Sequence, residues 1–144
     1  MPRKNKRVHE RRLGQKSLNK LIRSVDIKPR RMEIWFAYLR EEAGSAVQCG
    51  ARPVLIVGNN LGNKHSEVVT AIPMTSREKR LDLPTHVRLR CDENPSLGRD
   101  STLLVEQIMP IDKQRLRHRC GVLTNPQTIH RIEQAMSLQL GIST

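Results

Sequence analysis

From residue 32 onward, short apolar segments rich in β-branched residues alternate with residues that form turns. The segments are "RPVLIV" at 52–57, "SEVVTAIPM" at 66–74, "HVRLR" at 86–90, "STLLVEQI" at 101–108 and a weaker candidate, "RCGVL", at 119–123. Turn-forming residues separate them, in 58–62, at Pro84 and in "DENPSLGRD". Strands that are this short and closely spaced predict a small, strongly curved sheet or barrel.

The end of the chain has helical periodicity instead. Asn125 is a favourable N-cap, Pro126 suits the first helical position, and Gly141 is typical of a helix end. One face of this helix carries the apolar residues Ile129, Ile132, Met136 and Leu140. We expect this helix to pack on the sheet, and "IDKQRLRHR" predicts one helical turn capped by Asp112. The predicted fold class is therefore α+β, mostly β, with short helices and a C-terminal helix.

The segment "MEIWFAYL" at 32–39 holds all three aromatic residues of the chain, Trp35, Phe36 and Tyr38. Its composition predicts the first strand. Aromatic rings can stack on nucleic-acid bases, but a strand directs alternate side chains into a core, and we favour the core for these rings. The "REEAGSAVQCG" that follows predicts a long flexible loop.

Basic residues are concentrated near the N-terminus. Residues 1–31 hold 12 Lys or Arg against two acidic residues, a net charge of +10, whereas residues 32–144 hold 14 against 12, a net charge of +2. We therefore divide the chain into a basic extension, 1–31, partly helical or disordered, and a body, 32–144. The extension has one apolar helical face, made of Leu18, Leu21, Ile22 and Val25.

A basic extension attracts polyanions without sequence preference, so nucleic acid is the favoured partner and an anionic membrane the lesser one. A solvated tail that only aids solubility is the alternative. The chain has no run of roughly 18 apolar residues that would span a membrane, and its basic start lacks the apolar segment of a secretory signal. We expect a soluble, cytoplasmic protein with no membrane partner.

Common catalytic motifs are missing from the sequence. It contains no G-x-S-x-G, Walker loop, H-E-x-x-H or dinucleotide fingerprint. The chain has three cysteines, Cys49, Cys91 and Cys120, and no C-x-x-C pair. We interpret all three as reduced thiols. Three histidines could offer an acid–base pair for RNA cleavage: His65, His86 and His118. We favour structural roles for them. The acids that we interpret as isolated rather than as a metal cluster are Asp100, Glu106 and Asp112.

Three blocks resemble successive motifs of the MazF/PemK toxin family, the sequence-selective endoribonucleases of toxin–antitoxin pairs. The blocks are "ARPVLIVGNNLGN", "AIPMTSREKRLDLPTHV" and "GRDSTLLVEQIMPIDKQRL". They follow the family's order and spacing over about residues 30 to 141. The resemblance implies a small SH3-like β-barrel and a homodimer that is neutralised by a cognate antitoxin. It also implies cleavage of single-stranded RNA with no metal or cofactor, through attack by the 2′-hydroxyl, leaving a 2′,3′-cyclic phosphate and a 5′-hydroxyl.

The same resemblance assigns two catalytic residues. The family's catalytic arginine, in its R-P-V-L block, matches Arg52, and its catalytic threonine matches Thr75. Arg52 precedes an apolar strand that anchors its backbone, and its planar guanidinium suits phosphate oxygens. Because arginine keeps its proton in proteins, we expect Arg52 to stabilise the phosphorane rather than to act as a base. Thr75 would donate a hydrogen bond to the same phosphate or orient the 2′-hydroxyl.

Further RNA-binding residues follow from the resemblance. The family's G-S-E-Q-G-G loop and its "EQI" block, together with the serine after Thr75, assign Gly44, Ser45, Gln48, Gly50, Ser76, Glu106 and Gln107. The loop "GSAVQCG" departs from the family because it has an extra residue and lacks the glutamate. Met32 and Glu33 replace the usual Gly-Asp, and Asn60 replaces a common aspartate. Glu106 and Gln107 are equally explained by hydrogen bonds at a sheet edge.

Two other functions stay open. One is a nucleic-acid-binding module that has lost catalysis and binds mainly through its basic extension. The other is the activity of the related barrel toxins that poison DNA gyrase. Arg52 together with Thr75 argues against the gyrase poison, because that pair has no evident use there.

Overall fold

The computed structural model describes residues 27–41, 43–77 and 83–143. Its strands are β1 (Glu33–Leu39), β2 (Gly50–Ile56), β3 (Val68–Thr75), β4 (His86–Leu89), β5 (Ser101–Leu104), β6 (Met109–Asp112) and β7 (Leu116–Val122). Its helices are α2 (Asn60–His65), the 3₁₀ turns η1 (Val105–Gln107) and η2 (Lys113–Arg115), and α3 (Pro126–Leu140). No helix within these ranges has the length and apolar character needed to cross a membrane. The predicted helix at 18–25 lies outside the described residues.

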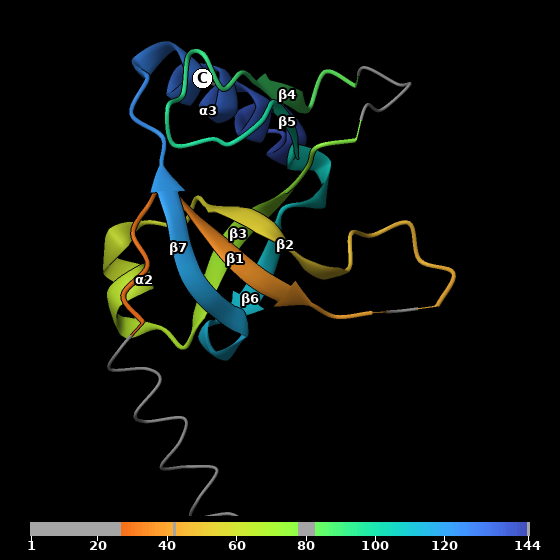
Figure 1. Ribbon diagram of the computed structural model, residues 1–144, viewed down its shortest axis with the longest axis vertical. Helices are drawn as coiled ribbons and strands as arrows, with labels where there is room; N and C mark the ends of the chain where they lie inside the picture. The colour runs from red at the N-terminus through yellow and green to blue at the C-terminus, as the bar shows by residue number, and fades with distance from the viewer. Residues whose placement is uncertain (1–26, 42, 78–82, 144) are drawn as a thin grey trace, which may run out of the picture.

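The strands form one antiparallel sheet in the order β4-β5-β3-β2-β1-β7, with β6 also paired to β3. The edge of β3 that faces away from β2 is shared by β6 and β5 in succession. Figure 1 shows α3 beside β4 and β5, while residues 43–49 project away from the sheet. The predicted mostly β fold with short helices and a C-terminal helix is confirmed. Closure of the sheet into a barrel stays a prediction.

Two apolar clusters pack on opposite faces of β2, which explains the uninterrupted apolar run in its sequence. Leu55 belongs to the cluster beneath α3, whereas Val54 and Ile56 belong to the second cluster. A strand that is buried on both faces needs consecutive rather than alternating apolar residues. All three side chains are fully buried, and removing a buried leucine side chain typically costs about 2–5 kcal/mol of stability. The backbone of β2 is therefore firmly held.

Three segments differ from the sequence prediction. The turn predicted at 58–62 contains the start of α2, whose N-cap Asn59 accepts a hydrogen bond from the backbone of Gly62 at 2.7 Å. The strand predicted at 101–108 ends at 104 and continues as η1, and β6 follows as a separate strand. The candidate strand at 119–123 begins earlier, at residue 116. The turn capped by Asp112 is confirmed, because its carboxylate accepts a hydrogen bond from the Gln114 amide at 2.9 Å.

Helix α3 matches its predicted ends. Asn125 caps it, and Gly141 ends it in the left-handed region with a φ of 66°. Ile132 is buried, and Ile129 and Met136 pack against the same cluster. Leu140 is 54% exposed, so its assignment to the packed face is wrong. The helix contacts β4 and η1, and its buried residues end at Ala135, so its last turn runs past the surface that covers it.

The aromatic residues of β1 divide between core and surface. Trp35 is only 8% exposed and lies in the second apolar cluster, as predicted. Tyr38 is 48% exposed and Phe36 is half-buried, so the prediction of a core position is wrong for Tyr38. The reason is that successive side chains alternate between faces, and the face of β1 that carries Phe36 and Tyr38 is covered by the core only near Ile34.

Candidate functional site

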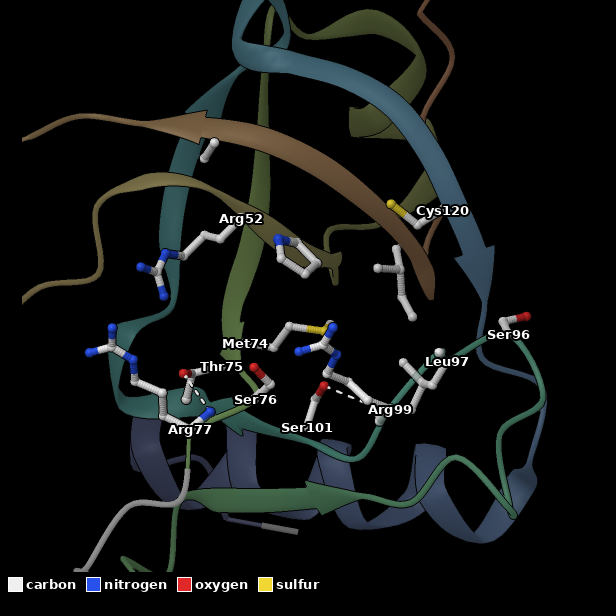
Figure 2. A pocket seen from close by; sticks show the side chains of 14 residues that line it. Arg52, Met74, Thr75, Ser76, Arg77, Ser96, Leu97, Arg99, Ser101 and Cys120 are labelled. Atoms are coloured by element: carbon white, nitrogen blue, oxygen red, sulfur yellow. Dashed lines mark hydrogen bonds between the residues drawn. The ribbon is translucent and has the colours of Figure 1, made fainter.

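Arg52, Thr75 and Ser76 line one cavity of about 430 Å³. Its walls come from the starts of β2 and β5, the end of β3 and the segment 96–99. In Figure 2 the side chains of Arg52 and Thr75 lie toward one end of this cavity and Ser96 and Leu97 toward the other. The two residues assigned to catalysis thus face a common space.

Arg52 stands in the first half of β2, opposite Ala37 of β1. Its guanidinium already has two partners, because Nε donates to the Cys49 carbonyl at 2.8 Å and Nη1 donates to the side-chain oxygen of Gln48. Gly50, between the loop and this arginine, has a φ of 76°, a conformation that favours glycine. Oxygens of two residues that precede β2 therefore hold the Arg52 guanidinium in place.

Thr75 is the last residue of β3 and is only 7% exposed. Its hydroxyl oxygen accepts a hydrogen bond from the Arg77 amide at 3.2 Å. A hydroxyl that accepts one hydrogen bond still has its own proton to donate. Thr75 can therefore offer a fixed donor to a ligand in the cavity.

Gln48 and Gln107 connect the loop to the rest of the molecule. The backbone amide of Gln48 donates to the side-chain oxygen of Gln107 on η1 at 2.7 Å, and the side-chain oxygen of Gln48 accepts from Arg52. Three of the residues that the sequence assigns to the site thus form one chain of hydrogen bonds. Their contact with RNA stays a prediction.

The remaining RNA-binding candidates lie outside this cavity. Gly44 and Ser45 are exposed in the loop, and Gly50 does not line the cavity. Glu106 contacts His86 at 2.9 Å, and its second carboxylate oxygen is buried without a hydrogen-bond partner among the described residues. Glu106 thus braces η1 against β4, which agrees with the structural explanation offered from sequence.

Two arginines of the cavity were missed by the sequence analysis. Arg77 and Arg99 line it together with Arg52, and no carboxylate of the described residues does so. Figure 2 shows Arg77 beside Thr75 and Arg99 on the segment that leads into β5. The sequence shows only that both arginines lie within the family blocks, since Arg77 follows Thr75 by two residues and Arg99 begins the "RDS" of the third block. The cavity is therefore cationic and suits an anionic ligand.

The histidines and acids that offered alternative chemistry lie apart. His65, His86 and His118 belong to α2, β4 and β7, and none of them lines the cavity. Within the described ranges, no group of three or more His, Cys, Asp or Glu side chains is arranged to hold a metal ion. Asp100 instead accepts a hydrogen bond from the Cys91 amide at 2.9 Å.

All three cysteines are free, as predicted. Cys120 lines the cavity, and although part of it is exposed, burial of the rest raises the pKa of its thiol. A hydrogen bond with Asp100 raises the pKa of the Cys91 thiol. Both groups are therefore protonated at neutral pH, and neither is an activated nucleophile.

The comparisons with known proteins agree on one family. The model of the "PemK-like, MazF-like toxin of type II toxin-antitoxin system" family matches residues 30–140. An endoribonuclease from a mycobacterial species is 26% identical with a TM-score of 0.64, over 82% of this chain and 96% of its own. A mycobacterial endoribonuclease in complex with its cognate antitoxin is 27% identical with a TM-score of 0.62, over 81% and 98%. MazF from Deinococcus radiodurans shares the fold at 21% identity and a TM-score of 0.67, over 80% and 98%.

Proposed function

Because the chain belongs to the PemK-like, MazF-like toxins of type II toxin–antitoxin systems, we propose that it is an endoribonuclease that cleaves single-stranded RNA without a metal ion. The observation that carries this proposal is the shared cavity of Arg52 and Thr75. Three arginines and no described carboxylate line it. A phosphodiester fits such a site, because the forked guanidinium donates to two oxygens at once.

The chemistry follows from the groups at this site. The 2′-hydroxyl oxygen attacks the adjacent phosphorus, the new 2′-oxygen bond forms, and the bond to the 5′-oxygen breaks. The products are a 2′,3′-cyclic phosphate and a 5′-hydroxyl. The 2′-hydroxyl proton passes to solvent and the 5′-oxygen takes one from solvent, because no described carboxylate or imidazole lines the cavity.

Arg52 and Thr75 stabilise the charge that develops in this step. The guanidinium stays protonated and donates to the phosphorane oxygens, where preorganised donors have their largest effect. The Thr75 hydroxyl donates to a non-bridging oxygen or orients the 2′-hydroxyl. Arg77 and Arg99 hold the flanking phosphates, and their contacts weaken as salt concentration rises.

The partners of this function are an antitoxin and a second copy of the chain. One related structure is an endoribonuclease in complex with its cognate antitoxin, and an acidic antitoxin segment would compete with RNA for the cationic cavity. Residues 32–144 would form the nuclease domain of a homodimer. The basic extension, 1–31, would add RNA affinity without base preference. Cleavage of mRNA would place the protein in the cytoplasm.

A second candidate is a nucleic-acid-binding module that does not cleave. It is favoured by one observation, because Arg52 is already bonded to the altered loop through Gln48 and Cys49. Were those bonds to persist with RNA bound, fewer donors of the guanidinium would be free for the phosphate. A gyrase poison has no such support, since it would have no use for Arg52 beside Thr75.

The two candidates separate in one assay. Purified protein is incubated with mixed RNA in EDTA, and the ends of the products are mapped. The proposal predicts 2′,3′-cyclic phosphate and 5′-hydroxyl ends, and no cut where the scissile ribose is 2′-deoxy. Arg52→Ala is expected to lower the cleavage rate by a factor of roughly 10²–10³, because it removes the main donor to the phosphorane.

The control is Arg131→Ala, which removes the same charge from α3, outside the cavity. It should cleave at nearly the wild-type rate, and thermal melting should show both variants folded. Intact RNA with salt-sensitive binding supports the module instead. Wild-type cleavage by Arg52→Ala would refute the assignment.

A further inference from the structure

Beside the cavity, β1 and β7 carry a cluster of rings, one half-buried and two exposed, which we call the aromatic platform: Phe36, Tyr38 and His118. The rings of Phe36 and His118 are stacked, with centroids 5.3 Å apart and planes 19° apart. Phe36 meets Tyr38 edge to face, with centroids 6.5 Å apart. Tyr38 is 48% exposed and His118 is also exposed. Flat rings that remain open to solvent offer a surface on which a planar group can stack.

The platform belongs to the same face of the sheet as the part of the cavity wall made by Ala51 and Pro53. Phe36 pairs with Pro53 and Tyr38 pairs with Ala51 across β1 and β2, and opposite residues in antiparallel strands present their side chains to one face. Both Ala51 and Pro53 line the cavity. Since neighbouring strands lie about 4.8 Å apart, the platform begins one strand away from the cavity wall.

The platform also has positive charge around it. The Arg117 guanidinium lies over the Tyr38 ring, 4.8 Å from its centroid. The side chain of Arg115 donates to the Tyr38 carbonyl at 3.5 Å. Aromatic rings beside cations are the combination with which proteins bind single-stranded nucleic acid, because bases stack on the rings while cations attract the backbone.

We propose that the aromatic platform stacks an unpaired base of the RNA whose phosphodiester lies at Arg52. This inference rests on the proposed function for the identity of the ligand. Tyr38 is the principal contact because it is 48% exposed whereas Phe36 is half-buried, Phe36 supports it from the side, and Arg117 covers one of its faces. The platform acts in substrate positioning, since it is separate from the residues that touch the reacting phosphate.

A second copy of the chain is the weaker occupant for this face. A symmetric contact places the same patch of both copies together, which would bring the two sets of Arg115 and Arg117 into proximity. A polyanion instead gains from both cations. The charge around the rings thus favours RNA.

The test uses full-length protein and an RNA oligonucleotide that contains a mapped cleavage site, made uncleavable by a 2′-deoxyribose at the scissile position. Tyr38→Leu keeps a similar apolar volume but removes the ring. Its Kd for the oligonucleotide should rise by roughly 5- to 150-fold, the range that base–aromatic stacking typically provides. Tyr38→Trp should restore binding to within about threefold of the wild type, because it restores a stacking surface.

A position scan separates stacking from a general loss of affinity. 2-Aminopurine is placed at successive positions of the oligonucleotide, and its fluorescence should be quenched by the wild type at one position and not by Tyr38→Leu. An abasic nucleotide at that position should weaken binding to the wild type but not weaken it further in Tyr38→Leu. The control Leu61→Ala removes an exposed apolar side chain on α2 and should leave the Kd unchanged.

Three results would overturn the inference. One is a wild-type Kd for Tyr38→Leu, and another is an equal effect of the abasic nucleotide in both proteins. The third is a change of oligomeric state in Tyr38→Leu by ultracentrifugation, which would assign the face to a contact between copies. If the wild type cleaves RNA while Tyr38→Leu binds normally, only the platform is refuted. If the wild type binds no RNA at all, both proposals fail.

Discussion

The cavity has a wall built from strands, whereas the loop that contacts Arg52 lies outside the cavity lining, and the two regions are held in different ways. Arg52 and Thr75 stand on β2 and β3, next to side chains such as Leu55 that are fully buried. The loop is exposed from 43 to 47, and the hydrogen bond from Gln48 to Gln107 ties its end to η1. The strands thus fix groups that need accurate placement, while the loop leaves room for variation in what is bound.

The largest effect on the cleavage rate is expected at the strand wall. Thr75→Val keeps the shape of the side chain but removes the hydroxyl, and the cleavage rate should fall by roughly 10²–10³, because one preorganised donor is lost. Single-turnover cleavage of a fluorescent RNA measures this rate. Thr75→Ser restores the hydroxyl and should recover most of the activity. Equal rates for Thr75→Val and the wild type would show that the hydroxyl takes no part.

A smaller effect is expected at the loop that precedes β2. Gln107→Leu removes the acceptor for the backbone amide of Gln48. The hydrogen bond that is lost contributes about 1 kcal/mol. The value of kcat/KM should fall about fivefold, and the relative use of different cleavage sites should change because the loop is released. Sequencing of the products measures both.

Gln134→Leu on α3 makes the same chemical change away from the cavity and should have no effect. A loss of activity in Gln107→Leu as large as that in Thr75→Val, with an unchanged choice of sites, would contradict the division between strands and loop.

The smallest effect is expected at Cys120. This thiol lines the cavity, but burial raises its pKa, so it is neutral at neutral pH and takes no part in charge stabilisation. Cys120→Ser should change the cleavage rate by less than about twofold, given the usual size of such polar swaps. Alkylation by iodoacetamide at pH 7 should be slower at Cys120 than at a free thiol in a peptide. Inactivation by the serine variant would assign the thiol a role.

Local signals explain most of what the sequence predicted correctly. The strand of 52–57 and the caps Asn125 and Gly141 depend on neighbours in the chain, so their residues were sufficient evidence. Helix α2 was missed because its Gly- and Asn-rich sequence is typical of a turn, whereas its buried Asn63 donates to the Gly58 carbonyl at 2.9 Å and stabilises the helix there. Exposure of Tyr38 depends on which parts of β1 other elements cover, and the sequence of β1 does not contain that information.

The site was predictable only in part for the same reason. Arg52 and Thr75 are 23 residues apart in the sequence, and no local pattern places them together, so only the resemblance to a family predicted a shared site. Arg77 and Arg99 were missed because neither has a local motif that marks it as facing a cavity. The resemblance also identified Met32 at a position where the family usually has Gly, and its φ of 71° lies in the region that favours glycine. Its buried side chain joins the cluster beneath α3.

Part of the hydrogen-bonding capacity of the Arg52 guanidinium is already in use, because Gln48 and Cys49 supply oxygens to Nη1 and Nε. If RNA displaced either oxygen, as the proposed function expects, one acceptor would replace another, and the net gain would be the difference between an anionic and a neutral acceptor. Water, sugars and other uncharged molecules gain almost nothing by displacing an amide oxygen. Under the proposed function, Arg52 would therefore favour anionic over uncharged ligands whatever the base sequence.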